Sequence, residues 1–238
     1  MIDSVFVIGK PGSGKTEMVR FQTSLLTADG FVVDTLSDRL WLEEAVLLDT
    51  KDGSVEPETG IRIGPHSKLL KDGAAGHRKI HVLDGILLNR VHDAMVEYIN
   101  ERRQPGTIVI AEYAIGPDIS FGPEKEPLLQ SCSQLIERIK RYLIKDRVLV
   151  IDVEAPLVAR TVRESLRPDA MDPETFRIYF PDGGEMTDDG VSLLGPHYLR
   201  IENGHSDFER FHREATETYQ RFVFPNIRSE GLLIGHFR

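Results

Sequence analysis

Cysteine, long hydrophobic runs and basic charge are all scarce in this sequence. Cys132 is the only cysteine, which excludes an intramolecular disulfide and a zinc site made of cysteines. No segment approaches the roughly 20 consecutive apolar residues of a membrane-spanning helix. The chain has 29 Lys and Arg against 38 Asp and Glu, a net charge of -9, which opposes general binding to nucleic acid or to anionic membranes. These shortages predict a cytoplasmic protein that has no membrane partner.

The overall composition is that of one globular domain. Of the 238 residues, 40% are hydrophobic and 28% are charged, which supplies enough apolar mass for a sizeable core. Cys132 falls in the apolar stripe of an expected helix, where a buried thiol is the simplest interpretation. We predict a single domain over residues 1–238.

Short apolar runs alternate with amphipathic helical segments along most of the chain. The runs expected to form strands are Ser4–Gly9, Phe31–Asp34, Ile80–Gly85, Thr107–Glu112, Arg147–Asp152 and Tyr198–Ile201. Continuous apolar runs are typical of parallel strands that are covered on both faces, and we expect Ser4–Gly9 to be central. Strands that alternate with helices favour right-handed crossovers. The predicted fold is therefore α/β, a three-layer, doubly wound and mostly parallel sheet.

Two segments interrupt this alternation. Residues of about 49–79 are rich in glycine and in charge, and only Ile61–Ile63 suggests a short strand there. Residues of about 160–196 begin with an arginine-rich helix and continue into a polar, glycine-rich stretch. We predict that the first segment is an inserted cap and that the second is a lid.

A phosphate-binding loop follows the first expected strand. Residues 9–16 read Gly-Lys-Pro-Gly-Ser-Gly-Lys-Thr and match the G-x-x-x-x-G-K-[ST] motif between a strand and a helix. In this motif backbone N–H groups converge on the phosphates, the lysine reaches the β and γ oxygens, and the hydroxyl completes a magnesium shell. The predicted nucleotide-binding residues are Gly9, Pro11, Gly12, Ser13, Gly14, Lys15 and Thr16. Lys15 is also predicted to be catalytic, and Thr16 to bind Mg2+.

The rest of the sequence narrows the class of P-loop protein. No N-K-x-D guanine motif occurs, which argues against a GTPase, and no Gly-x-Ser-x-Gly turn supports acyl transfer. A small-molecule kinase instead needs a carboxylate that faces the acceptor and arginines that neutralise the transferring phosphoryl group. The sequence contains candidates for both.

Two acids at the ends of expected strands are candidates for the catalytic carboxylates. Asp84 lies at the end of Ile80–Gly85, and Glu112 ends Thr107–Glu112. Ligands of open parallel sheets bind at the carboxyl ends of the strands, so we expect both acids to be catalytic. One acid would hold Mg2+ and the other would face the acceptor hydroxyl. We assign Asp84 to the metal together with Thr16. The opposite assignment, in which Glu112 binds Mg2+ and Asp84 faces the acceptor, stays open.

Arginines lie at the start of the predicted lid. Arg160, Arg163 and Arg167 are spaced by three and four residues, so a helix would place them on one face. A solvated charged face is the simplest interpretation of this spacing. Because the stripe lies between an expected strand and a glycine-rich loop, we predict a catalytic role, in which the three arginines reach the phosphates when the lid closes.

Several segments outside the loop carry a family resemblance. Residues 82–85, Val-Leu-Asp-Gly, resemble the region of the Asp-Gly-Phe-Pro-Arg motif in adenylate kinases, and residues 150–160 resemble the stretch where nucleotide kinases enter their lid. The segment that ends in Glu202-Asn203-Gly204 is similar to the adenine-side loop of these enzymes. The chain thus resembles adenylate kinase-like nucleoside and nucleotide kinases. The resemblance implies ATP and Mg2+ as cofactors and a role of Asn203 in binding ATP.

The acceptor side departs from the adenylate kinase pattern. After Asp84-Gly85, Ile-Leu-Leu stands where the pattern has Phe-Pro-Arg, so the arginine of that pattern is missing there. Thr107–Tyr113 resembles instead the strand of nucleoside and thymidylate kinases that ends in a carboxylate followed by an arginine or an aromatic residue. The resemblance therefore favours an acceptor other than AMP.

We predict an ATP-dependent kinase that transfers the γ-phosphoryl group to a nucleoside, a nucleotide or a similar small metabolite. Two alternatives stay open: a regulatory P-loop NTPase that switches a protein or RNA partner, and a kinase of RNA or DNA ends, which the acidic charge disfavours. The apolar run 231–237 is expected to form an extra edge strand, and its exposed side would suit a homodimer contact.

Overall fold

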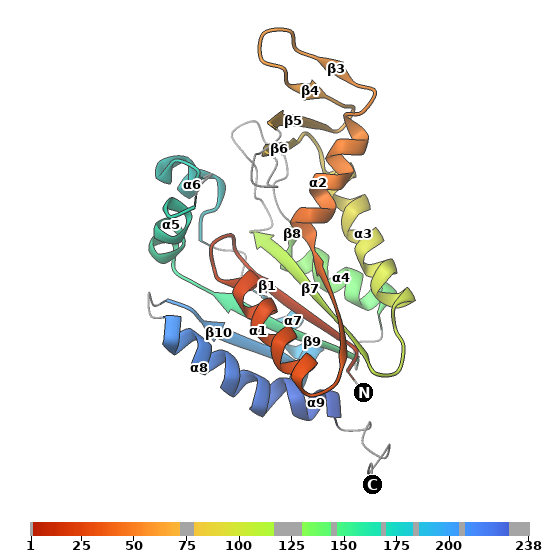
Figure 1. The fold of residues 1–238 in the computed structure, drawn as a ribbon, viewed down its shortest axis with the longest axis vertical. Coiled ribbons are helices and arrows are strands. Elements are labelled where there is room, and N and C mark those ends of the chain that lie inside the picture. The colour runs from red at the N-terminus through yellow and green to blue at the C-terminus, as the bar shows by residue number, and fades with distance from the viewer. Residues whose placement is uncertain are drawn as a thin grey trace.

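The structure, a computed structural model, describes residues 2–71, 79–116, 130–143, 147–167, 170–182, 186–204 and 208–228. Within these residues a parallel sheet lies between two layers of helices, and a smaller second sheet lies at one end of the molecule (Figure 1). The predicted three-layer α/β fold is confirmed.

The main sheet consists of strands in the order β10-β9-β1-β7-β2, and the short β8 pairs with the end of β7. The strands are β1 Ser4–Gly9, β2 Val32–Ser37, β7 Thr107–Gly116, β8 Gln130–Ser131, β9 Val148–Glu154 and β10 Tyr198–Glu202. All the pairings are parallel, and β1 is central as expected. Every residue of β1 is buried, because helices cover both faces of the sheet.

Helices form one layer on each face of the main sheet (Figure 1). One layer contains α1 Lys15–Ala28, α8 Phe208–Thr218, a π-helical turn at Tyr219–Val223 and α9 Phe224–Arg228. The other contains α2 Asp38–Asp49, α3 Gly85–Glu101, α4 Cys132–Tyr142 and α7 Asp188–Leu194, which leads into a 3-10 turn at Gly195–His197. Among the residues described, no helix is long and apolar enough to cross a membrane.

Each layer of helices has its own core, because neighbouring residues of a strand point to opposite faces of the sheet. Val5 and Val7 of β1 pack on the side of α1 and α8, whereas Phe6 and Ile8 pack on the side of α3 and α4. Cys132 lies in the second core and is 3% exposed, so the expected buried thiol is confirmed. Packing on both sides fixes the carboxyl ends of β1, β7 and β9 relative to one another.

The predicted insertion forms a separate antiparallel sheet between α2 and α3, which we call the cap sheet. Its strands pair in the order β3 Ser54–Val55, β4 Arg62–Ile63, β5 Ser67–Lys71 and β6 Lys79–Val82. A small apolar core joins it to the two helices and contains Val46, Leu69, Val82, Leu87 and Leu88. The expectation that Ile80–Gly85 belongs to the parallel sheet is wrong. A run of so few apolar residues fits an antiparallel strand with one buried side equally well.

The segment predicted as a lid divides into two parts. α5 Leu157–Ser165 and α6 Pro173–Tyr179 pack against each other beyond the end of β9 (Figure 1). Further along, Met186 and Leu194 are buried in the core that α4 covers. Residues from 186 onward therefore belong to a helical layer, and the predicted lid over 160–196 is too long. α7 has only 7 residues, too few to show a helical period within a polar stretch.

Some predicted features lie outside the described residues. They are the edge strand and the homodimer contact expected at 231–237.

Candidate active site

Residues 9–16 form the turn between β1 and α1, as the motif predicts. Gly12 and Gly14 have φ angles of 78° and 105°, in the left-handed region that favours glycine. A Cβ atom on Gly9 would lie 2.4 Å from the carbonyl oxygen of Val153, so a side chain has no room there. Among the residues described, the buried hydroxyl of Ser13 has no hydrogen-bond partner. A glycine cradle that opens a helix and keeps an unsatisfied polar group fits a phosphate ligand.

Lys15 begins α1, and its side chain folds back over the loop. Nζ donates a hydrogen bond of 3.1 Å to the carbonyl oxygen of Lys10. Burial lowers the pKa of Lys15, and the nearby carboxylates of Glu112 and Asp38 oppose this shift. A buried ammonium group that rests on a neutral carbonyl is well placed to take a phosphate oxygen, because a charged acceptor forms the stronger hydrogen bond.

Glu112 lies on β7, beside the strand that leads into the loop. It pairs in register with Val7, and β7 continues to Gly116, so Glu112 is not the last residue of its strand as expected. Its Oε1 accepts a hydrogen bond of 2.8 Å from the hydroxyl of Thr16. The structure therefore brings together two of the predicted site residues from distant parts of the chain.

Thr16 and Glu112 form a donor set that suits Mg2+. Hydroxyl and carboxylate oxygens are ligands that Mg2+ prefers, and the ion usually keeps several waters instead of a full protein cage. The described part of the chain contains no group of three or more acidic, histidine or cysteine side chains that could hold a metal. The residues present thus fit a magnesium ion that is shared with phosphates.

Asp38 is a site residue that the sequence pattern did not reveal. It is the first residue of α2, directly after β2, and it is 8% exposed. Its carboxylate accepts hydrogen bonds from the backbone N–H groups of Arg39 and Ala114. Burial raises the pKa of Asp38 to about 6, against the Ala114 hydrogen bond and the Lys15 ammonium. Asp38, Lys15 and Glu112 therefore form one electrostatic cluster.

The length of β2 concealed Asp38. The apolar run predicts a strand that ends at Asp34, whereas β2 continues to Ser37 through polar residues. Ser37 is the N-cap of α2, as expected, although its side chain makes no capping hydrogen bond. Asp38 could have been predicted only from its position after β2, since an acid directly after a parallel strand lies at the ligand-binding edge of the sheet.

Asp84 follows β6 of the cap sheet and not a strand of the main sheet. It is the N-cap of α3, and its Oδ1 accepts a hydrogen bond of 2.9 Å from Ile86 N–H. Its Oδ2 lies 2.8 Å from Nδ1 of His66, and this hydrogen bond is the main reason why the pKa of Asp84 is lowered. The expectation that Asp84 ends a strand of the parallel sheet is wrong, because the strand before it belongs to the cap sheet, and its binding of Mg2+ stays a prediction.

Arg163 and Asn203 fasten the outer side of the loop. The Arg163 guanidinium donates hydrogen bonds of 3.2 Å to the carbonyl oxygens of both Gly12 and Ser13. It also donates to the backbone and side-chain oxygens of Asn203, at 2.8 and 3.0 Å. The Asn203 amide in turn donates to the Ser13 carbonyl at 2.7 Å. Both residues hold the loop backbone, and their contacts with a nucleotide stay predictions.

Arg160 is fully buried against the loop. A Cβ atom on Gly12 would lie 3.1 Å from the Cβ of Arg160, so α5 packs tightly on the loop. The guanidinium donates hydrogen bonds to the carbonyl oxygens of Ala155, Phe180 and Pro181 and to the carboxylate of Asp182. The expectation that Arg160 shares an exposed helix face with the other two arginines is wrong, because its hydrogen bonds tie α5 to the segment after α6.

Arg167 is the most exposed of the three arginines. It lies beyond the end of α5, its side chain is 47% exposed, and it forms an ion pair of 3.0 Å with Glu164. Its positive charge is close enough to contribute to the lowered pKa of Lys15, after the larger effect of burial. Of the predicted lid arginines, Arg167 thus combines proximity to the site with a side chain that is free to reorient in solvent.

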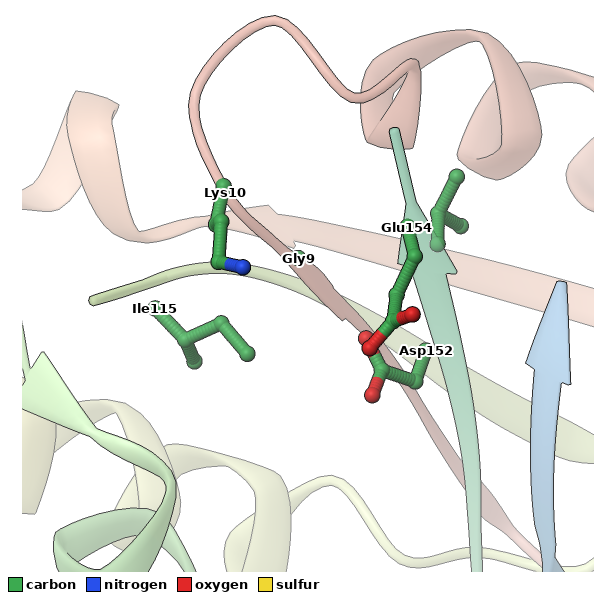
Figure 2. A pocket seen from close by; sticks show the side chains of 6 residues that line it. Gly9, Lys10, Ile115, Asp152 and Glu154 are labelled. Atoms are coloured by element: carbon green, nitrogen blue, oxygen red, sulfur yellow. The ribbon is translucent and has the colours of Figure 1, made fainter. Parts of the chain in front are cut away.

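A further group of charged residues lies beside the loop at the end of β9. Asp152 is 1% exposed, accepts a hydrogen bond of 2.8 Å from the hydroxyl of Tyr198, and has a pKa that burial raises to about 6. Asp152, Glu154 and Lys10 line a small cavity below the loop (Figure 2). The sequence analysis predicted the strand that ends in Asp152 but assigned this acid no role, because a single acid at the end of an apolar run is common.

The strand order and the loop after the central strand define the class of the protein: an α/β fold of the P-loop NTPase and kinase type. The phosphate loop, a carboxylate beside its threonine and a second buried acid after β2 lie at the carboxyl edge of the sheet, where this class binds its ligands.

Comparisons with known proteins find only distant similarities. No family model and no curated protein matches the sequence. Shikimate kinase from Acinetobacter baumannii, solved in complex with shikimate, is 15% identical over 93% of this chain and 94% of that chain, with a TM-score of 0.44. A sugar kinase from Janibacter sp. HTCC2649 is 12% identical over 95% and 98%, with a TM-score of 0.47. TT1252 from Thermus thermophilus is 13% identical over 98% and 99%, with a TM-score of 0.48. Similarity at this level carries no argument about the fold or the reaction of this chain.

Proposed function

We propose that this chain is an ATP-dependent small-molecule kinase, which transfers the γ-phosphoryl group to a hydroxyl group of a nucleoside, a nucleotide or a similar metabolite. The observation that carries the proposal is the cluster of Lys15, Thr16, Glu112 and Asp38 at the carboxyl edge of the main sheet. The cluster combines groups that suit phosphate and metal with a separate buried acid that suits a hydroxyl.

On the phosphate side, the loop would bind ATP through its backbone N–H groups, and Lys15 would exchange the Lys10 carbonyl for phosphate oxygens. Thr16 and Glu112 would hold Mg2+, which would neutralise part of the phosphate charge. Arg163 would keep the loop backbone in its bound shape through its contacts with the Gly12 and Ser13 carbonyls. Arg167 would approach the phosphates as α6 and the residues around it move.

On the acceptor side, Asp38 would act as the general base. Two backbone N–H groups fix the orientation of its carboxylate, and a pKa near 6 leaves it ionised at neutral pH but more basic than an ordinary aspartate. The acceptor oxygen forms a bond to the γ-phosphorus, the bond from that phosphorus to the departing oxygen of ADP breaks, and the hydroxyl proton passes to Asp38. The cap sheet, which lies between α2 and α3, would wall the acceptor pocket.

A screen for γ-phosphoryl transfer from ATP to nucleosides, nucleoside monophosphates, sugars and vitamin alcohols tests the proposal. With the best acceptor, we expect Asp38→Asn to lower kcat by ~100-fold or more at saturating Mg2+, because positioned general bases contribute about 10²–10⁴-fold. Glu112→Gln should lower turnover in a way that higher Mg2+ partly restores.

Asp84→Asn is the matched control for these two substitutions. Asparagine also caps helices well, so this variant should keep the fold and leave the Mg2+ dependence unchanged. If Asp84→Asn alone shifts the Mg2+ dependence, the metal site lies at the cap sheet and our assignment of Glu112 fails. If no metabolite accepts phosphate and ATP hydrolysis responds to a protein partner, the chain is a regulatory NTPase.

A further inference from the structure

The phosphate loop contains a second lysine, Lys10, that the motif does not explain. The motif fixes the glycines, Lys15 and Thr16 and leaves the second position open to any residue. A lysine at this position adds a positive charge to a chain that is strongly acidic overall.

The backbone of Lys10 lies within the turn that surrounds the phosphate position. Its carbonyl oxygen accepts the hydrogen bond from Lys15 Nζ and another, also of 3.1 Å, from the backbone N–H of Ser13. When Lys15 turns to a phosphate it must leave the Lys10 carbonyl. Events at the phosphates therefore act directly on Lys10.

The side chain of Lys10 faces two carboxylates. Together with Asp152 and Glu154 it lines the small cavity at the ends of β1 and β9, and Figure 2 shows the two carboxylates next to each other across from the Lys10 amino group. The positive charge of Lys10 acts on Asp152, as the lowering contribution to its pKa records. The positive charge of Lys10 therefore faces two acids across the small cavity.

Each carboxylate also has a second partner that holds it in place. Tyr198 donates a hydrogen bond of 2.8 Å to Asp152, and Arg200 Nε lies 3.3 Å from Glu154. The acids thus stay fixed and partly neutralised if Lys10 moves away. Lysine carries its charge on a flexible four-carbon stem, so a small change of rotamer redirects the ammonium group.

We propose that Lys10 is a second phosphate-binding lysine, which rests on Asp152 and Glu154 in the absence of nucleotide and contacts the γ-phosphate when ATP binds. The inference rests on the proposed function only in that the loop binds ATP. It gives Asp152 and Glu154 the task of holding Lys10 in its resting position. It also predicts that the loop binds ATP more tightly than ADP, because ADP has no γ-phosphate for the Lys10 ammonium to contact.

Nucleotide affinity measured by calorimetry with Mg2+, and without an acceptor, tests this proposal. Lys10→Met keeps the length of the side chain and removes its charge. We expect it to weaken binding of a non-hydrolysable ATP analogue by about ten-fold and to leave ADP binding unchanged, because one charge-assisted contact is lost. Lys10→Gln is the second neutral variant, and Lys140→Met, which removes a lysine paired with Glu137 on α4, is the matched control.

A double-mutant cycle separates the resting contact from the phosphate contact. Asp152→Asn with Glu154→Gln should tighten binding of the ATP analogue several-fold, since Lys10 no longer has to leave the acids, and this gain should vanish in the Lys10→Met background. Equal effects of Lys10→Met on ATP and ADP, or no effect on either, would overturn the proposal. If Lys15→Ala also leaves both affinities unchanged, the loop does not bind nucleotide and the proposed function itself fails.

Discussion

At the scale of single residues, the site holds two buried carboxylates, Asp38 and Asp152, whose ionisation opposes folding. Burial raises the pKa of each to about 6. An acid with a raised pKa in the folded chain binds its proton more tightly there than in the unfolded chain, so the folded state loses stability as the pH rises through this range. Such a cost is typical of groups that are kept for chemistry or for positioning and not for stability.

Asp152→Asn should therefore stabilise the protein above pH 7. Asparagine keeps an oxygen that accepts the hydrogen bond from Tyr198 and has no charge to bury. The stabilisation should be absent below about pH 4, appear between about pH 4 and 6, and reach at most about 3 kcal/mol, because each unit of pKa shift corresponds to about 1.4 kcal/mol. Urea unfolding of the wild type and the variant at pH 4 and pH 7.5 measures it. A difference that is the same at both pH values would show that the effect comes from packing and not from the charge.

The sequence predicted the residues of the site whose roles are set by local pattern. Lys15 and Thr16 belong to a contiguous motif, and Glu112 follows a long apolar run on a buried strand. Asp38 and Asp152 were missed because their importance comes from which strands are neighbours in space, and a single sequence does not contain that information.

At the scale of elements, the start of α5 is part of the phosphate loop's support. Arg160 of α5 is buried, and Arg163 of the same helix donates hydrogen bonds to a loop carbonyl and to Asn203, which follows β10. Movement that closes a lid must therefore begin after these two arginines, in the segment that contains α6. The spacing of the arginines predicted a helix correctly but could not show which of its faces lies against the loop.

Replacement of Arg160 tests the anchoring of α5. Arg160→Met leaves the carbonyl oxygens of Ala155, Phe180 and Pro181 without the guanidinium, and we expect a loss of about 3 kcal/mol or more in the free energy of unfolding. Val158→Ala, at a position of the same helix that is 71% exposed, should change stability by less than about 0.5 kcal/mol. Equal small losses in both variants would mean that apolar contacts, and not Arg160, hold α5 in place.

At the scale of the whole molecule, the cap sheet is a separate unit that the chain attaches through polar contacts and one small core. The carboxylate of Asp49 at the end of α2 accepts hydrogen bonds from His66 N–H at 3.0 Å and from the Ser67 hydroxyl at 2.6 Å. The contact of His66 with Asp84 joins the same turn to the start of α3. The composition located this insertion and Ile61–Ile63 predicted β4, whereas β3, of only 2 residues, was too short to give a periodic signal.

The hairpin of β3 and β4 forms the outer part of the cap sheet. Its deletion tests whether the cap sheet serves acceptor binding while the phosphate loop serves nucleotide binding. Replacement of residues 54–62 by two glycines should leave Tm within a few degrees, because the hairpin is largely exposed and the contacts of Asp49 with the turn before β5 are kept. ADP affinity should be unchanged, since no residue of the loop lies in the deleted segment. The KM for the acceptor should rise by about ten-fold or more if the hairpin walls the acceptor pocket, as a lost wall leaves part of the acceptor in water.

Val55→Ser, which keeps the hairpin, is the control and should leave KM close to that of the wild type. Loss of ADP binding in the deletion variant would show that the cap and the loop depend on each other for folding, whereas an unchanged KM would place the acceptor pocket on α2 and α3 alone.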